Sequence, residues 1–339
     1  MKRSFFVLGV AVAALASCTS EEVVDMPQSR AIQFGTFVNH STRSVTETTN
    51  ENLTKFFVFG NYDDAWTPVY TNVQVDGGKV GDQSTWTPTQ AAYWENGKTY
   101  RFGAYYDGEN KNTAVSFKAD EQKMTFENYA VNDSKDLIVA IPAEVTAQAS
   151  ENNPVNLSFY HMLSQVKFTF NNSDSHDYTM KISDIKVNAV KTATGTAIYK
   201  AEKPSIVWDT QSASQEEYNF GTLEDIAEDF DETTHTTTCF VIPQDNKNLQ
   251  VTFTATFYDA FDKQIASSTF RGDLNYQGNT EGTESGKWTP GFKYNYTVEI
   301  NGSIVDPSLE EQIIEFTVQA VEGWKDAANT DIENPTTTE

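Results

Sequence analysis

Cys18 is the residue whose setting points most directly to a covalent reaction. It follows Leu15-Ala16-Ser17, at the end of an apolar run that starts at Phe5 behind two basic residues. These are the features of a signal peptide, and the run is too short to span a bilayer, which takes roughly twenty apolar residues. A cysteine placed here is a lipobox cysteine, which is acylated and becomes the first residue after cleavage. We therefore predict a signal peptide over residues 1-17 and lipidation, including palmitate, at Cys18; the alternative is an ordinary signal peptide with an incidental cysteine.

The acidic excess of the chain restricts its partners. The sequence has 24 Lys and Arg against 48 Asp and Glu, a net charge of −24. Removal of residues 1-17 takes away two basic residues and leaves 22 against 48, or −26. Such a charge repels nucleic acid and anionic lipid surfaces. We therefore expect no nucleic-acid partner.

Common catalytic and metal-binding motifs are missing from the sequence. No two histidines have metal-ligand spacing, and the patterns HExxH, GxSxG, GxxxxGK[ST] and GxGxxG do not occur. We predict that the chain is not an enzyme and uses no cofactor and no metal. His161 is expected to be a hydrogen-bonded structural residue rather than a base. The histidines are His40, His161, His176 and His235.

The tryptophans are the candidates for a ligand-binding surface, because exposed aromatic rings can stack on sugars. Large aromatic side chains more often fill the core at strand ends, and we expect that here. The six are Trp66, Trp86, Trp94, Trp208, Trp288 and Trp324.

Alternation of apolar and polar residues dominates the chain and predicts an all-β fold of antiparallel sheets. Residues 222–235 allow a short helix, with an acidic loop as the alternative; their acidic side chains lack the spacing of a calcium loop. Turn-rich clusters between the runs predict about fifteen strands, with Cys239 buried in one of them. The predicted core residues are Phe34, Phe102 and Tyr106 in the first half, and Phe168, Phe253 and Val298 in the second.

A polar stretch over residues 146–154 divides the chain into two predicted domains, as its length also favours. We expect a lipidated tether over residues 18-30, an N-terminal β-sandwich over 31-150 and a C-terminal β-sandwich over 151-324. The polar residues 325-339 are expected to be disordered.

Short motifs follow one another in an order that is more informative than any one of them. In this order and spacing the chain, from Cys18 to about Trp324, resembles the fimbrillin family of Bacteroidales, which includes the major and minor fimbrial subunits of type V pili. The motifs are Ile32-Gln33-Phe34, Thr42-Arg43, Leu53-Thr54-Lys55-Phe56, Trp86-Thr87-Pro88, Tyr93-Trp94, the run from Tyr100 to Tyr106, Asp136-Leu137-Ile138-Val139-Ala140, the run from Leu157 to Val166, and Trp288-Thr289-Pro290-Gly291 before Tyr294-Asn295-Tyr296.

The resemblance implies two transthyretin-like antiparallel β-sandwich domains in tandem, made as a lipoprotein precursor. It implies a lipid-anchored protein of the cell outer membrane that is exposed on the surface and joins other subunits in a fimbrium, with a role in adhesion to a host or bacterial surface ligand. In the family, a protease that cuts after arginine removes the first strand, and a strand of a neighbouring subunit replaces it.

Two arginines flank the strand that would be removed. Arg43 lies in the polar stretch after it and Arg30 precedes it, although either could be an ordinary surface charge. A donor strand would have to come from Gln312 to Val321, because the tail after Trp324 has no alternating apolar residues; otherwise the chain is a tip or anchor subunit. The residues that alternate along the first strand are Ile32, Phe34, Thr36 and Val38.

The alternative function is a surface glycan-binding lipoprotein of a polysaccharide-uptake system. Two or three tryptophans on one exposed face would favour sugar binding, whereas a groove occupied by residues 32–38 would favour a pilus subunit. A lipoprotein enzyme would require a cleft with convergent polar groups, which the sequence does not indicate.

Overall fold

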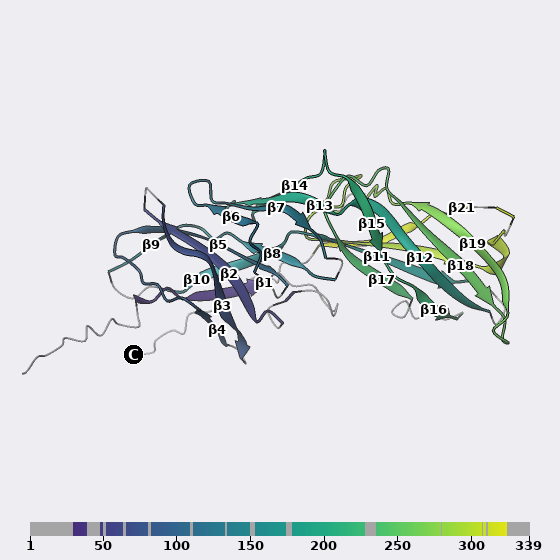
Figure 1. Ribbon diagram of the computed structural model, residues 1–339, viewed down its shortest axis with the longest axis horizontal. Coiled ribbons are helices and arrows are strands. Elements are labelled where there is room, and N and C mark those ends of the chain that lie inside the picture. Colours follow the sequence, from purple (N-terminus) through teal and green to yellow (C-terminus); the bar gives the residue numbers. More distant parts are fainter. Residues whose placement is uncertain are drawn as a thin grey trace, which may run out of the picture.

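The chain forms an elongated molecule of β-strands (Figure 1). The computed structural model describes residues 30–38, 48–49, 52–63, 66–80, 83–108, 111–132, 134–149, 153–173, 178–227, 235–278, 280–306, 308–309 and 311–323. Within these ranges there are 22 strands and no α-helix, so the all-β prediction is confirmed. The strands outnumber the predicted fifteen because several are too short to show alternation.

The first sheet curls back on itself around an aromatic core, so that its two edge strands, β1 and β4, approach each other. Its central strands are also covered on the outer face, which explains the unbroken burial of strand β8. The strand order is β1 (Phe34–Val38), β10 (Val155–His161), β8 (Leu137–Ala140), β5 (Thr99–Asp107), β2 (Lys55–Tyr62), β3 (Thr67–Val80) and β4 (Gln83–Pro88), with β9 (Val145–Thr146) also on β5.

A four-stranded sheet near the centre of Figure 1 covers the outer face of the first sheet. The contact is close: a Cβ added at Gly103 of β5 would lie 2.8 Å from the ring of Phe117. Two of its strands come from beyond the predicted boundary at 146–154, so this sheet joins both halves of the chain. The boundary itself stays a prediction. The strand order is β14 (Ser205–Asp209), β13 (Thr192–Ile198), β7 (Lys123–Ala130) and β6 (Val115–Lys118).

Two further sheets face each other in the second half of the chain. Phe170 and Phe253 meet between them, with ring centroids 4.9 Å apart. One sheet is β17 (Thr236–Val241), β11 (Ser164–Asn172), β20 (Phe292–Ile300) and β22 (Thr317–Gly323). The other is β15 (Gln215–Asn219), β12 (Thr179–Val190), β18 (Gln250–Tyr258), β19 (Gln264–Asp273) and β21 (Gln312–Ile313), with β16 (Leu223–Ile226) on β12; a 3₁₀ turn, η2 (Gly302–Ile304), follows β20.

The sheets are mixed rather than purely antiparallel as predicted. Strand β1 runs parallel to β10, β11 runs parallel to β20, and β21 runs parallel to β19. Alternation shows which face of a strand is buried, and this is independent of the direction of its neighbour. The antiparallel prediction was therefore wrong for these three pairs.

Residues 223–226, where the sequence allowed a helix or an acidic loop, form strand β16 instead. On β12, Met180 and Ile182 lie opposite Ile226 and Leu223, so the four residues of β16 face three of β12. The bulge is accompanied by a φ of 53° at Asp225. A bulge turns residues three apart toward the same side, which imitates helical spacing in the sequence.

The predicted core is largely confirmed. Five of the six residues are buried, and Tyr106 is half-buried against the first core. Cys239 is also buried, in strand β17. The five are Phe34, Phe102, Phe168, Phe253 and Val298.

The side chain of Trp208 connects the four-stranded sheet to the rest of the core. Its ring lies 5.8 Å from Tyr129 of the same sheet, and its Nε1 donates to the carbonyl of Met162, which lies outside the sheet, at 2.8 Å. Gly195 leaves the space for this ring, because a Cβ there would lie 2.9 Å from it.

We expect Trp208→Ala to lower the free energy of unfolding by about 3 to 5 kcal/mol, since it opens a cavity and leaves a buried carbonyl unpaired. Trp66→Ala, at a half-exposed tryptophan, should cost much less. Urea unfolding followed by circular dichroism measures both. Equal losses would show that Trp208 does not connect the four-stranded sheet to the rest of the core.

Candidate functional site

The candidate site is the seat of the first strand, which we define as the groove that residues 30–38 occupy. Strand β1 lies at one edge of the first sheet and has a single strand neighbour, β10, in the described part of the chain. Phe34 lies opposite Val155, and Val38 opposite Phe159. An edge strand of this kind is the element of a sheet that can be exchanged most readily.

Two side chains of the segment point into the first core. Ile32 is 2% exposed and Phe34 is 3% exposed, while Gln33 between them is exposed. The Phe34 ring lies 5.8 Å from Phe102 and 6.0 Å from Phe56, edge-on to both. The alternation predicted for the first strand therefore holds at these positions.

The other predicted residues of the first strand are placed less completely. Thr36 is half-buried, and Val38 belongs to β1 although its side chain is not described. Cys18 and Arg43 lie outside the described residues.

The segment also bonds to the chain on its second side. Ile32 N donates to Ala92 O at 2.9 Å, and Trp94 N donates to Arg30 O at 2.9 Å. Ala31 and Tyr93 form an antiparallel bridge between these two bonds. Residues 30–32 are therefore held by residues 92–94, and residues 34–38 by β10.

Arg30 is fixed in this arrangement. Its backbone carbonyl accepts from Trp94 N, and its Nη2 donates to Trp94 O at 3.0 Å. The sequence singled out Arg30 as a cleavage candidate, and the structure places it as a contact of the seat.

A buried His–Asp pair lies at the end of strand β10. His161 Nδ1 is 2.7 Å from Asp136 Oδ2, and Thr48 N donates to the same oxygen at 3.2 Å. The exposed fractions of His161 and Asp136 are 3% and 2%, so a substrate has no access to either group. The pair ties together three segments around the seat, in agreement with a structural role for His161.

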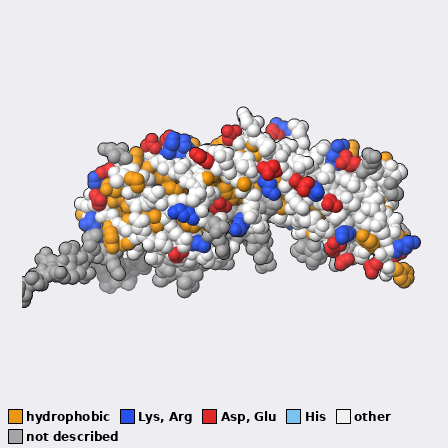
Figure 2. Space-filling model, in the orientation of Figure 1, with side chains coloured by type: hydrophobic (Ala, Val, Ile, Leu, Met, Phe, Trp, Pro, Cys, Tyr) orange, Lys and Arg blue, Asp and Glu red, His pale blue; other side chains and the backbone are white. Residues whose placement is uncertain are grey.

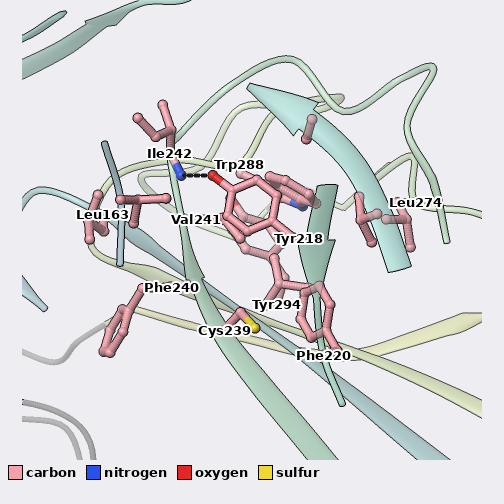
Figure 3. Packing of buried hydrophobic residues seen from close by; sticks show 14 of the residues in the cluster. Leu163, Tyr218, Phe220, Cys239, Phe240, Val241, Ile242, Leu274, Trp288 and Tyr294 are labelled. Carbon is pink, nitrogen blue, oxygen red and sulfur yellow. Dashed lines mark hydrogen bonds between the residues drawn. The ribbon is translucent and has the colours of Figure 1, made fainter. Parts of the chain in front are cut away.

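Most tryptophans fill the core rather than a binding face. Trp86, Trp94, Trp208 and Trp288 are at most 8% exposed. Figure 3 shows Trp288 packed with Tyr218 and Tyr294, in the core that also contains Cys239. Trp66 is half-exposed, with the Arg101 guanidinium 4.2 Å from its ring, and Trp324 lies outside the described residues. Four of the six therefore cannot stack on a sugar.

The described surface shows neither a metal centre nor a membrane helix. No group of three His, Cys, Asp or Glu side chains in the described ranges could hold a metal ion. None of the described residues forms a helix that is long and apolar enough to cross a membrane. On the face in Figure 2, acidic and basic side chains are interspersed, without an extended basic patch.

Sequence reasoning missed the edge at residues 92–94, although the sequence contains a signal for it. The pattern Trp-x₂-Gly-x₂-Tyr-x-Phe/Tyr occurs twice, from Trp94 to Phe102 and from Trp288 to Tyr296. We call each copy a Trp corner. Gly97 and Gly291 occupy the same place in the two copies, with φ of 77° and 76°, which favours glycine.

The two Trp corners have equivalent hydrogen bonds as well as the same sequence pattern. Glu95 N donates to the Tyr100 hydroxyl at 2.8 Å, and Thr289 N donates to the Tyr294 hydroxyl at 2.8 Å. Burial raises the pKa of both tyrosines, so the hydroxyls stay neutral and accept these bonds. This repeat indicates that β5 and β20, the strands at the two corners, are counterparts of each other.

Comparison with solved structures gives distant similarities. A proposed cell adhesion protein from Bacteroides uniformis ATCC 8492 is 16% identical over 88% of this chain and 100% of that chain, with a TM-score of 0.49. Proposed polysaccharide-binding proteins from Bacteroides thetaiotaomicron VPI-5482 are 10% identical over 87% of this chain and 95% of that chain, with a TM-score of 0.42. The fimbrial anchor protein Mfa2 from Porphyromonas gingivalis is 12% identical over 78% of this chain and 90% of that chain, with a TM-score of 0.33.

Comparison with sequences gives one family. No curated protein matches the chain. The fimbrillin-like family model matches residues 42–324, which is most of the sequence. The resemblance seen in the sequence motifs is thereby confirmed, and the chain belongs to the fimbrillin-like family.

Proposed function

We propose that this protein is a surface fimbrial subunit or accessory subunit, anchored in the outer membrane through lipid on Cys18, that assembles by strand replacement and serves adhesion. The observation that carries the proposal is the seat: residues 30–38 close the first core, and the chain reaches Arg43 directly after them. Its partners are other fimbrial subunits.

The energetics of the seat favour replacement over simple loss of the strand. Ile32 and Phe34 are nearly fully buried, so their removal costs roughly 1.5 to 3 kcal/mol each. Water can bond to the backbone groups left behind on β10, but it cannot offset the exposed apolar surface. An incoming strand satisfies both needs, as in other cases of strand addition.

The contacts of Arg30 and the order of the sequence favour Arg43 as the processing site. A cut after Arg30 would break the peptide bond whose carbonyl accepts from Trp94 N, and would leave β1 attached to the body. A cut after Arg43 would separate residues 18–43, including the whole strand, from the rest of the chain.

A candidate donor sequence lies within residues 312–321, the range considered in the sequence analysis. Ile314-Glu315-Phe316 repeats the order of Ile32-Gln33-Phe34. In this subunit Phe316 packs against the second core, 5.7 Å from Phe168, where a Cβ at Gly272 would collide with its ring. The segment thus carries the side chains that the seat of another subunit would bury.

The alternative, a surface glycan-binding lipoprotein, has less support. It would need a cluster of exposed tryptophans, and four of the six are buried. The half-exposed Trp66 has an arginine over its ring, and a single ring of this kind makes a small platform.

We expect Cys18→Ala to abolish fatty-acid labelling and to move the protein from the membrane fraction to the soluble fraction, because the acyl chains are its anchor. Metabolic labelling with a radioactive fatty acid, followed by fractionation, measures both. Cys239→Ala is the matched control, since this cysteine is buried and should leave labelling unchanged. Full labelling of Cys18→Ala would remove the anchor from the proposal.

We expect limited trypsin treatment to convert the purified precursor into polymers that resist denaturant. Arg43→Ala should block this conversion, whereas Arg30→Ala should not, because only a cut after Arg43 detaches the strand. Size-exclusion chromatography and electron microscopy measure polymer formation. A cleaved protein that stays monomeric at high concentration, even with partner subunits of the family present, would refute strand replacement.

A further inference from the structure

We propose that the emptied seat accepts a strand in one direction only, parallel to β10, and that residues 92–94, which lead into the first Trp corner, enforce this direction. The proposal rests on strand replacement, the proposed function, for the event that empties the seat. The occupant is an extended segment of another subunit with an apolar residue and an aromatic residue in the places of Ile32 and Phe34.

The first argument is that the seat has two backbone edges with different polarity. Residues 30–32 run antiparallel to residues 92–94, and residues 34–38 run parallel to β10. The segment changes from one edge to the other at Gln33. Ile32 N still donates to Ala92 O, whereas the carbonyl of Gln33, the next residue, accepts from Val155 N at 2.8 Å. Parallel and antiparallel ladders place their hydrogen bonds differently. A reversed strand would therefore mismatch both edges at once.

The second argument is that the second half of the chain has the same antiparallel backbone bonds, made by a segment in the interior of the chain. Asn246 N donates to Gly286 O at 2.9 Å, and Trp288 N donates to Gln244 O at 2.9 Å. Asp245 and Lys287 form an antiparallel bridge between these bonds, as Ala31 and Tyr93 do in the first half.

Residues 244–246 thus occupy the same place at the second Trp corner as residues 30–32 do at the first. They link β17 to β18 and are part of the continuous chain. Residues 30–32, in contrast, precede the candidate cut at Arg43. Of the two corners, the first is therefore the one whose partner can leave, and an incoming strand must bond to it.

The third argument concerns the side chains that the seat selects. The ring of Phe34 lies among Phe56, Phe102 and Tyr70, with centroids 5.8 to 6.0 Å away. A Cβ at Gly35 would lie 3.0 Å from Asn156 Oδ1, the end of an exposed side chain that a small shift would clear. The seat therefore selects the order apolar, any residue, aromatic.

Peptide capture tests this direction. The protein is the full mature chain with a specific protease site within residues 39–47 and with Phe34→Asp, which weakens the resident strand so that the seat opens after cleavage. The probes are fluorescent peptides with the sequence of residues 30–38, with the reversed sequence, and with the original sequence carrying Asp for Phe34. Fluorescence anisotropy measures binding.

We expect the original peptide to bind at least about ten-fold more tightly than the reversed one, since two or more backbone hydrogen bonds are lost on reversal. The Asp-containing peptide should bind weakly as well. Equal binding of the original and reversed peptides, or capture of neither, would overturn the proposal.

Matched glycine variants test the role of the first Trp corner. Gly97→Ala and Gly291→Ala introduce the same strain at the same place in the two copies. Both should lower the melting temperature to a similar extent, but only Gly97→Ala should weaken peptide binding, by several-fold. Equal effects on binding would show that residues 92–94 do not take part.

These outcomes are distinct from failure of the proposed function. Directional capture of the peptide without polymers would leave the seat established and exclude assembly through it. Polymers without peptide capture would support a fimbrial subunit and refute this seat as the acceptor.

Discussion

The structure depends on one constraint: the backbone edges around the first core must be closed by a segment that is bonded on both of its sides. Residues 30–32 meet residues 92–94, and residues 34–38 meet β10. The aromatic core beneath is complete only when Phe34 is in place. The same segment therefore closes the edge and completes the core.

The second half contains a matching arrangement within its continuous chain. Its Trp corner has the same glycine conformation, the same tyrosine hydroxyl bond and the same antiparallel bridge, but its partner segment lies between β17 and β18. The two halves differ mainly in how that partner is connected to the chain. In the proposed assembly, this connection, rather than the local geometry, would distinguish a fixed core from an exchangeable one.

Much of the fold could be predicted from the sequence, because alternation reports which face of a strand is buried. Phe34, Phe168 and Phe253 are buried as expected. Strand direction could not be predicted, since a half-buried strand has the same pattern beside a parallel or an antiparallel neighbour. The bulge in β16 produced a helical spacing without a helix.

The candidate site was predictable in part. The side chains that fill the seat, Ile32 and Phe34, were identified by their alternation, whereas its second edge was not, because it depends on contacts between distant residues, such as Trp94 and Arg30, which are 64 positions apart. The repeated Trp corner was visible in the sequence, but its meaning requires the hydrogen bonds. The participation of β13 and β14 in the sheet that covers the first half depends on tertiary pairing, which local patterns do not record.

The register between β1 and β10 also determines how the precursor responds to mechanical force. A lipid on Cys18 would transmit tension through the tether to residue 30, along the axis of the strand. The hydrogen bonds of the ladder lie across that axis. Tension would therefore load them together in shear instead of opening them one after another like a zipper. In the proposed lipid-anchored precursor, the uncut first strand would for this reason be a strong point of attachment, and a cut after Arg43 would transfer the load to the strand that replaces it.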